Sequence, residues 1–300
     1  MAKTWREYEK DICEAFRTEY PDAKILVNQY RVGRYSKAKR QIDILIEGQI
    51  AGNLFSIVID GKFYGRKVHV KGVESFISMV SDIGAHKGLI ITQKGYTRSA
   101  INRAYNDPLD IEVDILSFEQ LKEFQGFEAI PYSGNAGAVL RAPFGWVIDG
   151  HQYEKPFAPA HIYQRGLTLA EAFGRKELIY VRFWDRAKNG EDTTDLLAIQ
   201  KKNFEQFDPG VKIEYPSTIT RNDAPTVMRL AIVPRYGGIH EYTGFVEFKN
   251  FILFLVLFTP PQLAKKNVRK LESVMLNALP MTVTYSAKPA KSDVGDIQVG

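Results

Sequence analysis

The chain has 300 residues, of which 45% are hydrophobic and 25% are charged. These proportions are typical of an ordinary globular protein and exclude an acidic disordered chain. Forty Lys and Arg residues outnumber 35 Asp and Glu residues, so the net charge is +5. Spread over the whole chain, this excess is too small to identify a partner, and its placement along the sequence matters more than its size.

Cysteine content and hydrophobic patterning exclude further classes. The single cysteine, Cys13, cannot form an internal disulfide, and it excludes a zinc site built on several cysteines. The longest apolar run, residues 251–258, is eight residues long, whereas a membrane-spanning helix needs about 20. The first residues also lack the apolar stretch of a signal peptide. We therefore expect a cytoplasmic protein without a membrane span.

The first part of the chain alternates helical and strand patterns at short spacing. Apolar residues at helical spacing predict helices over 4–16, 70–83, 97–105 and 117–124. Runs rich in Ile, Val and Leu predict strands over 25–32, 41–47, 54–60, 88–92 and 112–116. This order predicts an α/β domain over residues 1–130, with a mixed sheet flanked by helices.

A second α/β region is predicted after residue 145. Gly and Pro interrupt the periodicity over 131–145, which we interpret as a linker. Further on, the pattern predicts strands near 178–184, 228–234, 244–249, 251–259 and 281–285, and a helix over 261–279. The sequence thus predicts a C-terminal α/β domain over 146–288 and a flexible tail over 289–300.

Two neighbouring strand patterns carry charged residues among apolar ones. Strand alternation places the isoleucines of residues 42–46 on one face and Asp43 on the other. In the next strand pattern, Asp60 and Lys62 are two residues apart and therefore share a face. Two carboxylates can hold Mg²⁺ beside a phosphate, and a lysine can orient or deprotonate the attacking water. The alternative is an ordinary ion pair at a strand end, with a solvated Asp43.

Glu9 is a third candidate carboxylate, on the first predicted helix. At 100° per residue it lies 40° from Trp5, on the shoulder of the apolar face that packs on the sheet. A carboxylate on that side needs a partner. A metal near Asp43 and Asp60 would supply one, and pairing with Arg6 is the alternative.

These residues resemble a known family. Gln-Ile-Asp-Ile-Leu-Ile at 41–46 and Ile-Val-Ile-Asp-Gly-Lys-Phe-Tyr at 57–64 are similar to the PD-(D/E)XK nuclease superfamily, and most similar to its Mrr-type restriction endonuclease domains. Gly-Ala-His-Lys-Gly-Leu-Ile-Ile-Thr at 84–92, Gly-Tyr-Thr-Arg-Ser-Ala at 95–100 and the Tyr-Glu pair at 8–9 also resemble that group. The resemblance covers residues 4–125 and implies a restriction-endonuclease-like fold there.

The resemblance implies a metal-dependent DNA endonuclease, expected in bacterial restriction or anti-phage defence. Asp43, Asp60 and the auxiliary acid Glu9 would be metal ligands, and Lys62 would be the catalytic lysine. Mg²⁺ is the expected cofactor, with Mn²⁺ as a substitute, and double-stranded DNA cut by a homodimer is the expected substrate. Two positions depart from the pattern: Ile42 replaces the usual Pro, and Asp60 replaces the Glu usual in Mrr-type domains.

Positive charge is concentrated around this motif. Residues 31–71 contain nine basic and three acidic residues, whereas residues 101–130 carry a net charge of −5. Phosphate binding requires such a cluster, although a solvated face would have the same composition. The candidate phosphate contacts are Arg34, Lys37, Lys39, Arg40, Arg66, Lys67, Lys71 and Lys94. Tyr35 and Tyr64 lie within the cluster and are candidates for contact with sugar or base.

The C-terminal half has no catalytic pattern. Phe-Gly-Trp at 144–146 and the closing helix and strand distantly resemble Mog1/PsbP-type α/β/α sandwiches. This resemblance implies a binding role, such as targeting the cut or sensing a regulatory partner. A scaffold that extends the DNA surface or forms a dimer is the alternative.

For the whole chain, the competing class is a non-catalytic nuclease-like module that binds DNA or protein within a larger complex. RNA or branched DNA stays an alternative substrate.

Overall fold

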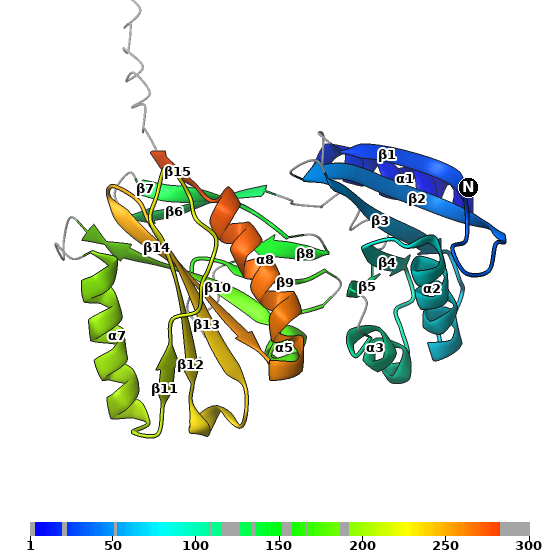
Figure 1. Ribbon diagram of the computed structural model, residues 1–300. Coiled ribbons are helices and arrows are strands. Elements are labelled where there is room, and N and C mark those ends of the chain that lie inside the picture. The colour runs from blue at the N-terminus through cyan, green and yellow to red at the C-terminus, as the bar shows by residue number, and fades with distance from the viewer. Residues whose placement is uncertain are drawn as a thin grey trace, which may run out of the picture.

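The computed structural model describes residues 4–19, 23–50, 53–107, 110–115, 127–133, 136–143, 145–151, 158–165, 167–186 and 192–282. A mixed five-stranded sheet with helices occupies the N-terminal part, and two further sheets with helices occupy the rest of the chain (Figure 1). The predicted mixed α/β class is therefore confirmed. Among the helices in these described segments, none is long and apolar enough to cross a membrane.

The N-terminal elements follow the predicted order. They are α1 (Trp5–Glu19), β1 (Lys24–Val32), β2 (Lys39–Ile50), β3 (Asn53–Lys62), α2 (Val70–Ile83), β4 (Lys87–Thr92), α3 (Arg98–Tyr105) and β5 (Asp110–Ile115). The strands lie in the order β1-β2-β3-β4-β5, with β1, β2 and β3 antiparallel and β3, β4 and β5 parallel. Gly84 ends α2 with φ 68°, in the left-handed conformation that glycine adopts readily. The predicted helix over 117–124 lies outside the described residues.

Apolar side chains fill both faces of this sheet. On one face, Tyr8, Ile12 and Phe16 of α1 pack with buried isoleucines of β2 and β3. On the other face, α2 contributes Val73 and Phe76, which pack with apolar residues of the same strands. The end of β3 is thus held between two hydrophobic layers, which gives a charged group there a fixed position.

The C-terminal part contains two sheets. Its elements are β6 (Phe127–Ser133), β7 (Ala136–Arg141), β8 (Trp146–Asp149), β9 (His161–Gln164), α5 (Leu169–Arg175), β10 (Leu178–Asp185), α7 (Thr193–Phe207), β11 (Lys212–Glu214), β12 (Thr226–Ile232), η1 (Pro234–Tyr236), β13 (His240–Glu247), β14 (Phe251–Thr259), η2 (Pro261–Leu263), α8 (Ala264–Asn277) and β15 (Leu279–Thr282). Seven strands form the order β11-β12-β13-β14-β10-β9-β8, and three form the order β15-β7-β6. Helices α7 and α8 pack with different apolar clusters and lie on opposite sides of the larger sheet (Figure 1).

The predicted linker over 131–145 is wrong in its secondary structure. Most of it is a β-hairpin, β6 paired with β7, and β15 completes the sheet. A Cβ at Gly137 would lie 2.6 Å from the carbonyl oxygen of Ile130, so glycine permits this close strand pairing where we interpreted it as a break. The division into two domains stays a prediction, and the predicted tail over 289–300 lies outside the described residues.

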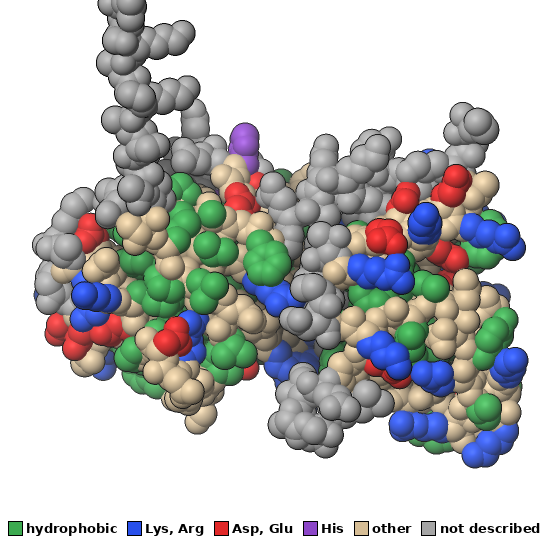
Figure 2. Space-filling view, turned by 90° about the horizontal axis from the view of Figure 1, so that it is seen from above, with side chains coloured by type: hydrophobic (Ala, Val, Ile, Leu, Met, Phe, Trp, Pro, Cys, Tyr) green, Lys and Arg blue, Asp and Glu red, His purple; other side chains and the backbone are tan. Residues whose placement is uncertain are grey.

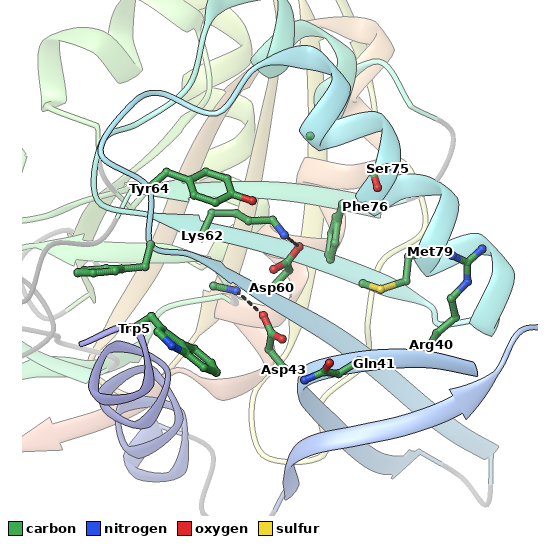
Figure 3. A pocket seen from close by; sticks show the side chains of 13 residues that line it. Trp5, Arg40, Gln41, Asp43, Asp60, Lys62, Tyr64, Ser75, Phe76 and Met79 are labelled. Carbon is green, nitrogen blue, oxygen red and sulfur yellow. Dashed lines mark hydrogen bonds and ion pairs between the residues drawn. The ribbon is translucent and has the colours of Figure 1, made fainter. Parts of the chain in front are cut away.

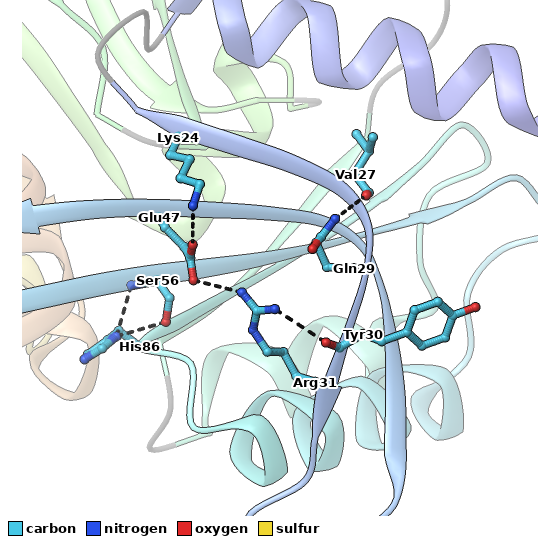
Figure 4. Close-up of polar contacts among 8 residues, drawn as sticks. All are labelled: Lys24, Val27, Gln29, Tyr30, Arg31, Glu47, Ser56 and His86. Atoms are coloured by element: carbon cyan, nitrogen blue, oxygen red, sulfur yellow. Dashed lines mark hydrogen bonds and ion pairs between the residues drawn. The ribbon is translucent and has the colours of Figure 1, made fainter.

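Polar contacts join the outer strands of the N-terminal sheet (Figure 4). Glu47 on β2 pairs with Arg31 at 3.3 Å and with Lys24 at 3.9 Å, both on β1. Nearby, the backbone N–H of Ser56 donates to Nδ1 of His86 at 3.1 Å, and the imidazole stacks on Phe55. The histidine thus joins β3 to the segment before β4, which is a structural role.

Candidate active site

Asp43 and Asp60 lie side by side on neighbouring antiparallel strands. Ile44 on β2 pairs with Ile59 on β3, so the next position along places Asp43 opposite Asp60. Figure 3 shows the two carboxyl groups facing the same cavity. Asp60 is only 9% exposed, and its carboxyl group is therefore largely removed from bulk water.

Lys62 completes the group. Its Nζ lies 2.5 Å from Oδ2 of Asp60, which confirms that the two side chains share a face of β3. Between them, the backbone N–H of Gly61 donates to Oδ2 of Asp43 at 3.2 Å. The last residues of β3 therefore position both carboxylates and the ammonium group.

The strand alternation around Asp43 is less regular than predicted. Ile44 packs on the α1 side of the sheet, whereas Ile42 packs on the α2 side. Across from Asp43, Asn28 on β1 has φ 49°, in the left-handed region that asparagine tolerates better than most residues. This local irregularity accompanies the exposure of Asp43 to cavities on both sides of the sheet.

The main cavity has a volume of about 650 Å³ and opens beside the end of β3. The first residues and the middle of α2 form one wall, and the aromatic side chains of Trp5, Phe63 and Tyr64 also line it (Figure 3). A second cavity, of about 480 Å³, lies toward α1 and shares Trp5, Gln41 and Asp43 with the first. A substrate at the carboxylates would thus meet aromatic and charged groups together.

Glu9 lies close to the carboxylate pair but lines the second cavity. A Cβ on Gly61 would lie 3.6 Å from Cγ of Glu9, so this side chain approaches the face of β3 opposite Asp60. Among the residues that the structure describes, no three His, Cys, Asp or Glu side chains form a cluster that could hold a metal ion. The role of Glu9 as a metal ligand stays a prediction.

Burial and the neighbouring charges shift the pKa values of the acidic and basic groups of the site. Burial, the charge of Asp60 and a hydrogen bond with its carboxyl group raise the pKa of Asp43 to about 7. Burial, followed by the charge of Asp60, also raises the pKa of Glu9. Burial by itself would lower the pKa of Lys62, but the adjacent Asp60 carboxylate outweighs that effect and raises it. Two adjacent carboxyl groups thus share one ammonium group, with Glu9 on the other side of β3, and the two Asp side chains offer the oxygen ligands that a divalent cation prefers.

Several of the predicted phosphate contacts have partners within the protein. Arg40 pairs with Asp82 at 2.8 Å, and Nζ of Lys37 donates to the carbonyl oxygen of Arg34 at 2.9 Å. The ammonium group of Lys39 lies 4.2 Å above the ring of Tyr30. Lys37 and Lys39 are nevertheless exposed, as are the remaining five predicted contacts: Arg34, Arg66, Lys67, Lys71 and Lys94. Figure 2 shows Lys and Arg side chains spread over the N-terminal part of the surface.

Asp82 is a positioning residue that the sequence analysis did not identify. Its carboxylate accepts the backbone N–H groups of Tyr35 and Ser36 at 3.0 Å each, and also the Ser36 hydroxyl at 2.5 Å. These hydrogen bonds, those of Ser36 first and that of Arg40 with them, lower the pKa of Asp82. The available signal was an acidic residue within the apolar pattern of helix 70–83. Asp82 fixes the basic turn between β1 and β2 onto α2.

The C-terminal part has a separate buried charge cluster. Arg229 on β12 is 2% exposed and donates to Glu241 at 2.9 Å and to Thr243 at 2.7 Å. It also donates to Gln200 on α7, and its guanidinium group lies 4.8 Å from the ring of Phe204. This cluster lines a cavity of about 300 Å³ beneath α7. The sequence analysis predicted neither α7 nor this cluster.

Comparisons with known proteins find a family match in the N-terminal part of the chain. Residues 2–124 match a family model described as "Restriction endonuclease", Mrr_cat. No curated protein matches the chain. The Mrr-type resemblance of the sequence is therefore confirmed, over the part of the chain that holds the carboxylates and the lysine.

Solved structures show partial similarity. The DNA modification-dependent restriction endonuclease AspBHI is 16% identical, with 40% of this chain and 37% of that chain covered and a TM-score of 0.25. A protein of unknown function, AF1548, is 19% identical over 41% of this chain and 68% of that chain, with a TM-score of 0.32. PsbP (CyanoP) from Synechocystis sp. PCC 6803 is 13% identical over 51% of this chain and 92% of that chain, with a TM-score of 0.34.

Proposed function

We propose that this protein, whose residues 2–124 form an Mrr-type restriction endonuclease domain, is a metal-dependent DNA endonuclease of bacterial restriction or anti-phage defence. The observation that carries this proposal is the convergence of Asp43, Asp60 and Lys62 at the end of β3. Mg²⁺ is the proposed cofactor and Mn²⁺ its substitute. Double-stranded DNA is the proposed substrate, and a homodimer would cut both strands.

The carboxyl groups would hold the metal, and the lysine would stabilise negative charge on the phosphate. A bound Mg²⁺ lowers the pKa of water and neutralises charge on the phosphate. Asp43 and Asp60 supply the oxygen ligands, with Glu9 as the auxiliary acid behind β3. Because the carboxylate of Asp60 raises the pKa of Lys62, its Nζ stays protonated at neutral pH. Lys62 therefore stabilises negative charge on the phosphate and orients the attacking water.

The C-terminal domain would target or regulate the cut through a partner. The exposed basic residues around α2 would bind the DNA backbone, and their contribution would weaken as salt increases. The competing function is a non-catalytic module that binds DNA or protein. Two carboxyl groups and a lysine at hydrogen-bonding distance are costly to bury. A module that only binds has no chemical need for them.

Plasmid cleavage with and without Mg²⁺ tests the proposal. We expect Asp60→Ala and Lys62→Ala to reduce the cleavage rate by at least about 100-fold, because each removes a group that acts on the transition state. Lys24→Ala is the matched control, since this exposed lysine pairs with Glu47 away from the cavity. Thermal unfolding of each variant checks that the fold is intact. Equal cutting by parent and variants would show that the site is misassigned.

Calorimetry separates the enzyme from the binding module. The proposal expects Mg²⁺ binding that is lost in Asp43→Ala and Asp60→Ala and retained in Lys24→Ala. DNA binding without cleavage, together with no Mg²⁺ or Mn²⁺ binding that depends on Asp43, would favour the non-catalytic module.

A further inference from the structure

We infer that Trp5, Phe63 and Tyr64 form a stacking site for an unpaired nucleobase beside the scissile phosphate. Within double-stranded DNA, the preferred sites would then be those with an unpaired segment at the cut, such as a flap or a junction between single strand and duplex. This inference rests on the proposed function, because it places the stacking site at the nuclease centre.

Three large aromatic side chains are exposed around one cavity. Trp5 is 47% exposed, Phe63 is 37% exposed and Tyr64 is 50% exposed. All three line the cavity that holds Asp43 and Asp60. Apolar surface gathered in this way around a polar site commonly marks a binding surface.

Trp5 departs from the packing of its own helix. Its spacing with Tyr8, Ile12 and Phe16 predicts that all four residues face the core. The other three are between 0% and 1% exposed, whereas the indole of Trp5 remains at the rim. The Trp5 ring therefore lies outside the core, on the wall of the cavity.

The three rings come from two segments: Trp5 begins α1, and Phe63 and Tyr64 follow directly after β3. Phe63 lies 5.6 Å from the ring of fully buried Tyr8, which ties it to the core. Figure 3 shows Tyr64 on the side of Lys62, and Trp5 on the side of Asp43. Two cations accompany them: Nζ of Lys62 lies 6.0 Å from the Tyr64 ring, and the guanidinium group of Arg6 lies 5.4 Å from the Trp5 ring. Aromatic faces next to cations match the bases and phosphates of a single strand.

Base pairing decides which DNA can use such a site. In a continuous duplex both faces of each base are covered by neighbouring bases, and exposing one face requires unstacking it. A base that is already unpaired avoids this cost and stacks on an aromatic side chain with about 1–3 kcal/mol. The rings would therefore favour a substrate with unpaired bases near the reacting phosphate.

Cleavage of matched oligonucleotides tests this preference. The substrates share one sequence and differ in form: a continuous duplex, a duplex with a single-stranded flap, and a single strand, each with Mg²⁺. We expect the flap to be cut at least about 10-fold faster than the duplex, which corresponds to one stacked base. Trp5→Ala and Tyr64→Ala should remove most of the rate difference between flap and duplex by raising the KM for the flap. Trp5→Phe and Tyr64→Phe should restore the difference. Tyr215→Ala, at a 53% exposed tyrosine of the C-terminal part, should leave the ratio unchanged.

A binding measurement separates this inference from the proposed function. In the Asp60→Ala variant, a single-stranded oligonucleotide should quench the fluorescence of Trp5, and the quenching should disappear in Asp60→Ala/Trp5→Phe. Equal cleavage of the three substrates, or a preference for the continuous duplex, would overturn the stacking site while leaving the nuclease intact. Without any cleavage, Trp5-dependent quenching would still support the site, and its absence would overturn it.

Discussion

The two parts of the chain each contain a charge cluster, and the clusters differ in balance. At the end of β3, Asp43 and Asp60 share one lysine in an open cavity, and the pKa of Asp43 rises to about 7. Under α7, Arg229 and Glu241 form a pair, 2% and 4% exposed, that has additional hydrogen bonds to uncharged side chains.

The difference separates a cluster that stabilises the fold from one that suits a ligand. In the C-terminal cluster, one guanidinium group faces one carboxylate, and hydroxyl and amide groups hydrogen-bond to both. In the N-terminal cluster, two adjacent carboxyl groups share one lysine, and Asp43 holds a proton up to a pH of about 7. A bound metal cation would take the place of that proton. A protein tolerates such a cluster at a functional site, where stability is exchanged for chemistry.

Breaking the balanced cluster should have the largest effect on stability. Arg229→Met leaves Glu241 buried without its partner, and loss of one member of a buried pair costs ~3–5 kcal/mol. We expect a decrease of this size in the free energy of unfolding, measured by urea denaturation.

The double variant Arg229→Met/Glu241→Gln is the matched control. It removes both charges, so it should recover much of the lost stability. A single variant as stable as the parent would contradict the view that this pair is part of the structural core.

Relieving the unbalanced cluster should have a smaller effect of opposite sign. Asp43→Asn removes one of two adjacent carboxyl groups, and we expect a gain of ~1–2 kcal/mol at pH 8 without metal. The pKa of Asp43 is higher in the folded protein than in the unfolded chain, so its ionised form opposes folding at high pH. The stability difference between variant and parent should therefore shrink as the pH falls below about 7.

Thermal unfolding from pH 5 to pH 8 measures this difference. Glu205→Gln is the control, since this acid is exposed on α7 and pairs only loosely with Lys201. Mg²⁺ should stabilise the parent more than Asp43→Asn. A variant that is less stable than the parent at pH 8 would contradict the repulsion between the two carboxyl groups.

The sequence predicted the N-terminal elements and the carboxylate pair because their patterns are local. Alternation along β3 was sufficient to place Asp60 beside Lys62. The helical spacing of the apolar residues in α2 was sufficient to predict both of its ends, at residues 70 and 83. The position of Trp5 depended on how many residues the core could accept, and the role of Asp82 depended on a turn 46 residues earlier in the chain. No pattern within one element contains that information.

The C-terminal part was harder to predict for a related reason. Glycine and proline in residues 131–145 resemble a linker, yet Gly137 permits a close strand pairing with β6 that is completed by β15, from the other end of the domain. The polar residues of α7 obscured its helical pattern, because its inner face covers the charge of Arg229 and carries few apolar side chains.

The ion pairs of Glu47 form a third charge cluster, at the protein surface, and it should contribute the least to stability. Glu47 pairs with Lys24 and Arg31, whose side chains are 69% and 43% exposed. Solvent already screens such charges, so Glu47→Gln should change the free energy of unfolding by less than ~1 kcal/mol. Urea denaturation at low and high salt measures the effect, which should vanish at high salt. If Glu47→Gln lost as much free energy of unfolding as Arg229→Met, burial would not distinguish the two clusters. A small loss instead supports burial, and not the number of ion pairs, as the property that separates them.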